Sequence, residues 1–290
     1  MDGVLVIDKP TGLTSHDVVA KARRILGIRR IGHLGTLDPL ATGVLPLVVG
    51  RATRLAQFFR DREKAYEGAM RLGFATNTYD RTGTPITDPA ELLASEAEIE
   101  TAFRELTGEY EQQPPPISAK KVGGVEAYKL ARRHESVDLP PVPVSVKEFV
   151  LLGYEAPIAR FRVRCSGGAY VRSLVHDAGR RLGCGAHVAE LRRTASGEFT
   201  EKEAITLERL RELQAEGGAA EALFSAEKLL PEFPPYRLPP AIVASVLHGR
   251  DFRTFPPVTS ARIKVLAPDG RLLAIAERAD AGFYHPSIVL

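Results

Sequence analysis

One stretch of the chain combines a carboxylate with residues that bind polyanions. The segment RRIGHLGTLDPLATG, residues 29–43, places Asp38 after two arginines and His33, and before the apolar run VLPLVVG. Its glycines allow close backbone approach or a positive φ, and arginines suit phosphate contacts. The pattern indicates a loop that meets a nucleotide and directs Asp38 at it. The pair Asp38-Pro39 also fits the N-cap and first residue of a short helix, so a structural role stays open.

The chemistry available to Asp38 depends on whether a second acid accompanies it. A carboxylate held against a ribose can attack C1′ or stabilise an oxocarbenium-like centre. Hydrolysis usually needs a second carboxylate. Glu63 and Glu67 flank Tyr66, but strand alternation directs them towards solvent. One acid without a partner favours glycosyl transfer or rearrangement over hydrolysis.

The charges are segregated along the chain, although the net charge is only +3. Residues 21–30 hold five cations and no acid, and residues 160–193 hold eight arginines against Asp177 and Glu190. Acids gather instead in residues 88–111 and 198–232. Such segregation suggests a basic face for a polyanion. Scattered solvated arginines are the alternative interpretation.

Bulk properties exclude several classes of protein. A length of 290 residues predicts about two domains. No apolar run reaches the roughly 18 residues of a membrane span, and the first residues do not form a signal peptide. Cys165 and Cys184 have no zinc or disulfide pattern, and no P-loop or Rossmann glycine signature is present. We expect a cytoplasmic protein without a metal or a cofactor.

Several elements can be predicted around the loop. Thr14 and Asp17 form a capping box for a helix over 15–26 that Gly27 ends, and Ser95 and Glu98 form a second one. Further helices are expected at 53–61 and 171–182, and strands at 4–7, 44–49, 66–72, 145–153, 159–165 and 186–196. Strands and helices interleave without regular βαβ spacing. This predicts an α+β fold with a mixed, mainly antiparallel sheet flanked by helices.

Two segments stand apart by composition. Residues 112–141 are rich in proline, glycine and cations, which predicts a long mobile insertion with a short helix at 125–133. The proline-rich segment PEFPPYRLPP, residues 231–240, predicts a boundary between a domain over 1–233 and a module over 234–290. A helix at 240–247 and strands at 261–266 and 272–277 make this module small and β-rich, either packed on the first domain or tethered to it.

The loop around Asp38 and five further motifs of the chain resemble those of one protein family. GHLGTLDPLATGVLPL is similar to the catalytic motif of the bacterial TruB-type tRNA pseudouridine synthases, which convert the T-loop uridine at tRNA position 55. The family's other motifs follow in order: GVLVIDKPTGLTSHDVV, KAYEGAMRLGFATNTYDRTG, QQPPPISAKKVGGVEAYKLAR, GGAYVRSLVHDAGRRLG and HVAELRRTASGEF. The tail resembles a PUA-like RNA-binding module. The resemblance covers nearly the whole chain. One departure is Leu34, where the family usually has Thr or Ser.

The resemblance implies a catalytic set. Asp38 aligns with the nucleophilic aspartate, Tyr66 with the tyrosine that stacks on the target base and helps to move a proton, and Arg172 with the arginine that pairs with the carboxylate. Each has a rival reading from the residues alone. Tyr66 on an apolar strand face would ordinarily belong to the core. A phosphate contact is the less favoured rival role of Arg172.

The resemblance also implies substrate-binding residues. They are His33, which holds the flipped T-loop, Lys9, whose Lys-Pro motif supports the catalytic loop, Tyr170 in the pocket wall, Leu191 against the uracil, and Lys120 and Arg132 in the RNA-gripping insertion. A purely structural Lys9 is an equal alternative. His176 and Asp177 are neighbours on a helix and point in different directions, so we do not expect a dyad.

The implied activity is isomerisation of uridine 55 to pseudouridine on the T arm and elbow of tRNA, by base flipping, N-glycosidic cleavage and reattachment through C5, with no cofactor. Assistance of tRNA folding is implied as well, and we expect a monomer. Two other classes stay open. The first is an RNA-binding folding factor, with catalysis secondary or lost. The second is a nucleoside hydrolase that uses the same carboxylate.

Overall fold

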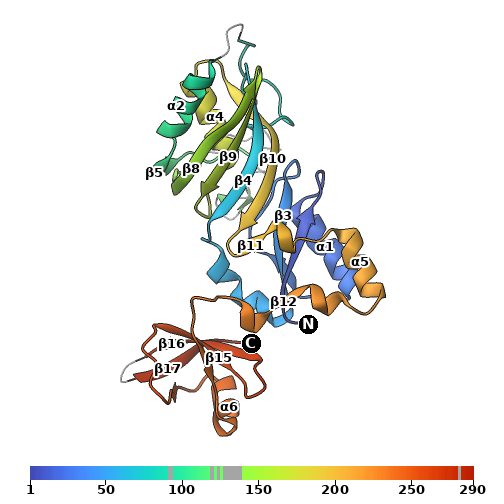
Figure 1. Ribbon diagram of the computed structural model, residues 1–290, viewed down its shortest axis with the longest axis vertical. Coiled ribbons are helices and arrows are strands. Elements are labelled where there is room, and N and C mark those ends of the chain that lie inside the picture. The colour runs from blue at the N-terminus through green and yellow to red at the C-terminus, as the bar shows by residue number, and fades with distance from the viewer. Residues whose placement is uncertain (91–93, 118–120, 123–124, 127–138, 280–281) are drawn as a thin grey trace.

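The computed structural model describes residues 1–90, 94–117, 121–122, 125–126, 139–279 and 282–290. Within these ranges the chain forms one large sheet with helices packed on it and a second, smaller sheet near the C-terminus (Figure 1). Both sheets are assembled mainly from antiparallel pairs.

The large sheet has ten strands among the described residues. Its spatial order is β12 (Leu223–Ser225), β1 (Gly3–Lys9), β3 (Thr42–Val49), β10 (Ala186–Ser196), β4 (Lys64–Leu72), β9 (Ile158–Cys165), β8 (Val142–Glu155) and β5 (Gly108–Gln112), while β2 (Ile31–His33) pairs with β3 and β11 (Phe199–Thr200) with β10. Only β3 and β10 pair in parallel within the described part of this sheet. That pair joins two antiparallel halves at the middle of the sheet.

Helices cover the two halves of the sheet separately (Figure 1). Helix α1 (Ser15–Leu26) packs with α5 (Leu207–Ala215) beside β1, and α2 (Glu96–Glu105) lies with α4 (Val171–Arg181) on the half formed by β8, β9 and β10. Both predicted capping boxes are present, and Gly27 ends α1 at a φ of 67°. A left-handed C-cap favours glycine because it has no Cβ to clash.

The core lies between the helices and the inner face of the sheet. It joins residues of β1, β3, β4, β9 and β10 to the apolar faces of the four helices. Alternation along β4 places Tyr66 and Met70 on this face, and Glu67 outside. The predicted direction of Tyr66 is therefore confirmed, and the inner face of β4 continues from the core to the candidate site.

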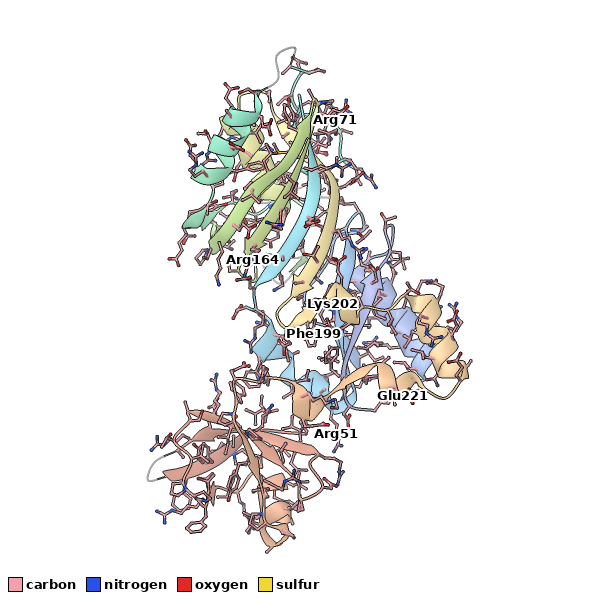
Figure 2. All side chains as sticks on the ribbon, viewed as in Figure 1. Arg51, Arg71, Arg164, Phe199, Lys202 and Glu221 are labelled. Atoms are coloured by element: carbon pink, nitrogen blue, oxygen red, sulfur yellow. The ribbon has the colours of Figure 1, made fainter. Side chains whose placement is uncertain are left out.

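The C-terminal residues form the second sheet with its own apolar cluster. Its elements are β13 (Pro235–Arg237), α6 (Pro240–Leu247), β14 (Phe252–Arg253), β15 (Arg262–Leu266), β16 (Leu272–Arg278) and β17 (Phe283–Val289). This module packs on the first sheet, because Leu272 and Ile275 share a cluster with Val4 and the Lys264 ammonium donates to the Leu229 carbonyl at 2.9 Å. Arg51, ion-paired with Asp2, lies near this junction (Figure 2).

The predicted fold class is confirmed, but some elements differ. The helix expected at 53–61 is present as a 3-10 helix, η1 (Gly50–Phe59), which begins three residues earlier. Val125 and Glu126 form the short strand β7 (Val125–Glu126), paired with β6 (Lys121–Val122), and the rest of the helix expected at 125–133 lies outside the described residues. The sequence reading missed α5 and β17. The three remaining 3-10 turns are η2 (Glu201–Glu203), η3 (Ala219–Ala222) and η4 (Ala226–Lys228).

Candidate active site

A cavity of about 970 Å³ opens where the two halves of the large sheet meet. Its wall comes from the loop between β2 and β3, from β4 and β10, from the start of α4 and from η1. The predicted residues that line it are His33, Asp38, Tyr66, Tyr170, Arg172 and Leu191. Asp38 is the only carboxylate among the described lining residues. The structure therefore brings six of the sequence-predicted residues to one place.

The loop that carries Asp38 is fixed by the turn after β1. The Ser15 hydroxyl accepts from the Leu37 amide at 2.8 Å, and the Pro39 carbonyl accepts from the Gly12 amide at 2.7 Å. The Ala41 amide donates to the Asp38 carbonyl at 3.1 Å, so Asp38 begins a single turn that does not continue as a helix. The capping alternative for Asp38 is therefore wrong, and its carboxylate is free for other partners.

Two buried cations hold the same loop from beneath. The fully buried Lys9 ammonium donates to the Leu13 carbonyl at 2.7 Å and to the Pro39 carbonyl at 3.4 Å. Arg193, also fully buried, donates from Nη2 to the Gly35 carbonyl at 3.1 Å. Burial lowers the pKa of Lys9 to about 8, against the opposing effect of Asp38. These contacts fit the role of Lys9 as a support of the loop, and its contribution to substrate binding stays a prediction.

Arg172 binds the Asp38 carboxylate through one edge of its guanidinium, formed by Nε and Nη2. Nε donates to Oδ2 at 2.9 Å and Nη2 to Oδ1 at 3.2 Å. The Arg172 side chain is 6% exposed, whereas that of Asp38 is 36% exposed towards the cavity. Such a bidentate pair fixes the direction of the carboxylate. The alternative role of Arg172 as a phosphate contact is therefore disfavoured by its geometry.

The sequence reading missed Asp80, which lies behind Arg172. Its side chain is 6% exposed, and its Oδ2 lies 3.8 Å from Arg172 Nη1. Its Oδ1 accepts from the Thr82 amide at 2.8 Å and from the Thr78 hydroxyl at 2.8 Å. A buried ionised carboxylate requires such partners. The signal available in the sequence was an aspartate between two threonines, TYDRT, which reads as an ordinary turn.

Tyr66 and Leu191 form an apolar wall opposite the charged pair. Each is 6% exposed, and they lie on the adjacent strands β4 and β10. Burial raises the pKa of the Tyr66 phenol, with the nearby Arg193 opposing this effect. The phenol therefore stays protonated at neutral pH. A flat ring and an aliphatic side chain in a cavity suit an unstacked base.

His33 lies at the rim of the cavity. Its ring contacts that of His16 edge-on, with centroids 5.3 Å apart. Burial lowers the pKa of His33 to about 4, and His16 adds to this effect, so His33 is neutral at pH 7. Its buried Nδ1 has no hydrogen-bond partner among the described residues. Leu34 beside it is a buried member of the cluster under β3, so an apolar residue suits this position.

The structure changes the picture of the basic face. Exposed arginines of β9 are ion-paired: Arg162 with Glu148, and Arg164, which is labelled in Figure 2, with Glu63. In contrast, residues 21–30 expose five cations with no ion pair among the described residues, directly before β2 and His33. These cations precede β2 in the chain, and Arg23 is tied to that strand by a hydrogen bond from Nη2 to the Ile31 carbonyl at 2.6 Å. Lys120 and Arg132 lie outside the described residues.

The arrangement defines what chemistry is possible. A single carboxylate among the described lining residues, directed by a buried guanidinium, faces a cavity with an aromatic and an aliphatic wall. Within the described ranges no group of His, Cys, Asp and Glu side chains is placed to hold a metal ion, and no helix is long and apolar enough to span a membrane. Cys165 and Cys184 are free and buried. Nucleophilic or electrostatic action of the carboxylate is what this site offers.

Two family models match consecutive parts of the chain. Residues 23–171 match the TruB family pseudouridylate synthase N-terminal domain, and residues 172–231 match the tRNA pseudouridylate synthase B C-terminal domain. The second match covers α4, β10 and α5, which belong to the large sheet and its helices. It ends before the second sheet begins.

Curated relatives match over their full length. The tRNA pseudouridine synthase B of Solibacter usitatus (strain Ellin6076) is 50% identical over 293 residues, with 100% of both chains covered. That of Thermobifida fusca (strain YX) is 43% identical over 297 residues, with 99% of this chain and 98% of the relative covered.

Solved structures agree with this match. A chain of an H/ACA RNP bound to a substrate RNA containing 2′-deoxyuridine is 27% identical, with a TM-score of 0.74 over 99% of this chain and 84% of that one. A chain of a Cbf5-Nop10-Gar1 complex is 30% identical, with a TM-score of 0.71 over 97% of this chain and 79% of that one. With the family models and curated relatives, these matches place the protein: the chain belongs to the TruB family of pseudouridylate synthases.

Proposed function

We propose that the protein isomerises uridine 55 in the T-loop of tRNA to pseudouridine. The observation that carries the proposal is the carboxylate of Asp38, fixed by Arg172 at the wall of a cavity whose described lining contains no other acid. The relatives named tRNA pseudouridine synthase B supply the substrate class. The specific position in the T-loop follows from the resemblance of residues 32–47.

The reaction exchanges one bond to the sugar for another. The target uridine leaves its stack and enters the cavity, where Tyr66 stacks on the base and Leu191 packs alongside. Asp38 promotes cleavage of the N1–C1′ bond, the uracil turns within the closed site, and C5 bonds to C1′. The proton at C5 is lost and N1 ends protonated, so atoms and charge balance without a cofactor.

Three routes share this start: attack of Asp38 on the sugar, attack on the base, and elimination at the sugar. Each requires an ionised carboxylate held at one angle. The two hydrogen bonds from Arg172 provide that orientation in advance, which removes reorganisation from the chemical step. Because the pKa of Tyr66 is raised, we assign Tyr66 to stacking and to hydrogen bonding as a neutral phenol.

Binding of the T arm and elbow would use the exposed cations of residues 21–30. Phosphate contacts from lysine and arginine supply most of the affinity for RNA and make it salt-dependent. The C-terminal module offers a further contact surface, since Phe255 is 88% exposed and the Arg253 guanidinium lies 4.8 Å from the centroid of the Phe283 ring. We keep a role of this module in RNA binding, the insertion's grip on RNA and a monomeric state as proposals.

One experiment distinguishes the proposed isomerase from the two alternatives, a nucleoside hydrolase and an RNA-binding folding factor. The protein is incubated with an unmodified tRNA transcript without added cofactor, and the nucleosides are analysed by liquid chromatography and mass spectrometry. We expect a carbon-linked isomer of unchanged mass at position 55, absent from a transcript with cytidine there. Free uracil would identify a nucleoside hydrolase. Unchanged RNA that is nevertheless bound would identify a folding factor, and either result would contradict the proposed function.

A further inference from the structure

Tyr79 adopts a backbone conformation that bulky residues rarely take. Its φ is 62°, in the left-handed region, and Leu230 is the only other non-glycine residue with a positive φ among those described. A large side chain in this region persists only where its surroundings impose it. The loop that contains Tyr79 lies between β4 and α2, directly beside Arg172.

Three contacts impose this conformation. The Tyr79 amide donates to the Thr76 carbonyl at 3.1 Å, and the Tyr79 carbonyl accepts from the Val188 amide of β10 at 3.0 Å. The Tyr79 ring stacks on the ring of His176, with centroids 3.7 Å apart and planes 8° apart. The backbone is thereby tied to the sheet and the side chain to α4.

The residues on either side of Tyr79 both reach the same nitrogen. The Thr78 carbonyl accepts from Arg172 Nη1 at 2.8 Å, and the Asp80 carboxylate lies 3.8 Å from that atom. A carbonyl and the side chain two residues later can face one guanidinium because the chain turns sharply at the left-handed residue between them. The conformation of Tyr79 thus arranges two of the acceptors that orient Arg172.

His176 is placed to transmit this arrangement. It lies four residues after Arg172 on α4, on the same face of the helix. Its buried Nδ1 has no hydrogen-bond partner among the described residues, and burial lowers its pKa to about 4. A neutral ring without a hydrogen bond at this nitrogen contributes mainly through its flat face. That face is the one that Tyr79 covers.

We propose that Tyr79 and His176 form a clamp that holds the Thr78 carbonyl and the Asp80 carboxylate on Arg172, and so sets the angle at which Arg172 presents Asp38 to the substrate. Both are positioning residues, because neither lines the described cavity. The kinetic consequence rests on the proposed function, whereas the effect on Arg172 does not.

The test uses variants that distinguish the stacking of the His176 ring from its imidazole chemistry. His176→Ala removes the ring, and His176→Phe restores a flat one. Tyr79→Gly keeps the left-handed backbone accessible but removes the stack. Tyr154→Ala, on β8, removes a tyrosine that packs on the same core, and serves as the control for general destabilisation. Two readouts are taken: the single-turnover rate with the tRNA dissociation constant, and the ¹⁵N signal of Arg172 Nε–H in the free protein, assigned with Arg172→Lys.

We expect His176→Ala and Tyr79→Gly to slow the reaction by about tenfold to a hundredfold, the scale of a small misplacement of reacting groups. Their affinity for tRNA should stay within about threefold, and the Arg172 signal should shift or broaden. His176→Phe and Tyr154→Ala should react at close to the wild-type rate. The proposal is overturned if His176→Ala leaves the Arg172 signal unmoved, or if His176→Phe is as slow as His176→Ala. If the wild-type protein forms no pseudouridine, the proposed function fails and the Arg172 signal alone decides on the clamp.

Discussion

The guanidinium of Arg172 and the carboxylate of Asp38 meet through two hydrogen bonds of 2.9 and 3.2 Å, although 134 residues separate them in the chain. Arg172 comes from the first turn of α4 and Asp38 from the loop before β3. Arg172 also donates to the Ile117 carbonyl at 2.9 Å, so the described start of the insertion is tied to the same guanidinium. One buried side chain therefore connects the reactive carboxylate with the predicted RNA-binding segment.

The guanidinium geometry of Arg172 is predicted to support turnover in addition to its positive charge. Arg172→Lys keeps one positive charge but cannot form the bidentate pair. We expect turnover to fall by about a hundredfold, since the carboxylate loses its fixed angle. The free energy of unfolding should fall by about 3 kcal/mol, because the buried Asp80 loses its partner.

The matched control is Arg164→Lys, at an exposed pair in which Nε and Nη2 both donate to Glu63 Oε1. An exposed pair contributes at most about 1 kcal/mol. Turnover assays and urea unfolding of both variants provide the comparison. Equal losses of turnover and of unfolding free energy in the two variants would show that the guanidinium geometry of Arg172 has no special role.

Lys9 is predicted to act on the rate and leave binding unchanged. Lys9→Met removes the ammonium that donates to the carbonyls of the loop around Asp38. Because Lys9 is fully buried, the tRNA dissociation constant should change by less than about threefold while turnover falls. Lys21→Met, which removes an exposed cation from residues 21–30, should instead weaken binding and reduce its salt dependence. Weak tRNA binding by Lys9→Met at a normal rate would refute this assignment.

Alanine substitutions at two glycines distinguish the cost of a strained backbone from the cost of a steric clash. Gly12 has a φ of 84° and an added Cβ would meet nothing within 4 Å, whereas at Gly43, with a φ of 96°, it would meet the Arg193 carbonyl at 2.3 Å. Gly12→Ala should cost about 1–2 kcal/mol of unfolding free energy for its left-handed backbone. Gly43→Ala should cost more and slow turnover, since it displaces β10 from the loop. Urea denaturation of the pair measures the difference, and equal costs would contradict this packing.

Stability should depend on pH through two half-buried histidines. The pKa values of His33 and His176 are lowered from 6.5 to about 4 in the folded protein by burial. Between these values the unfolded chain binds the protons first, so the free energy of unfolding should fall as the pH drops from 6.5 to 4. A His33→Asn, His176→Phe double variant should lose less stability over this range than the wild type. His248→Asn, at an exposed position, is the control, and identical pH profiles for all three proteins would exclude this cause.

Local signals predicted much of the fold. Thr14 with Asp17, and Ser95 with Glu98, mark helix starts because capping is a contact within a few residues. Tyr66 was placed on the inner face by alternation. Helix α5 was missed because its face is short and mostly charged, with only Leu207 and Leu210 buried. Strand β17 was missed because Pro286 interrupts its run of strand-forming residues, although it pairs with β16, the strand directly before it in the chain.

The site was less accessible to local reading. Motif resemblance identified Asp38, Tyr66 and Arg172, but spacing alone could not bring together residues from three separated segments. Asp80 escaped because its burial depends on β10 and α4, which lie far along the chain. Lys9 was assigned from the resemblance of its Lys-Pro motif, with a structural lysine as an equal alternative. Its burial arises only when the loop around Pro39 folds over it.

The most direct test of the account is the fate of a tritium at C5 of uridine 55, since bonding of C5 to C1′ releases it. Wild-type protein and Asp38→Asn are compared in single-turnover reactions, with tRNA affinity measured in parallel. We predict release by the wild type and none by Asp38→Asn, with affinities within about tenfold, or ~1.4 kcal/mol. Tritium release by Asp38→Asn at the wild-type rate, or its failure to bind tRNA, would contradict the central role of this carboxylate.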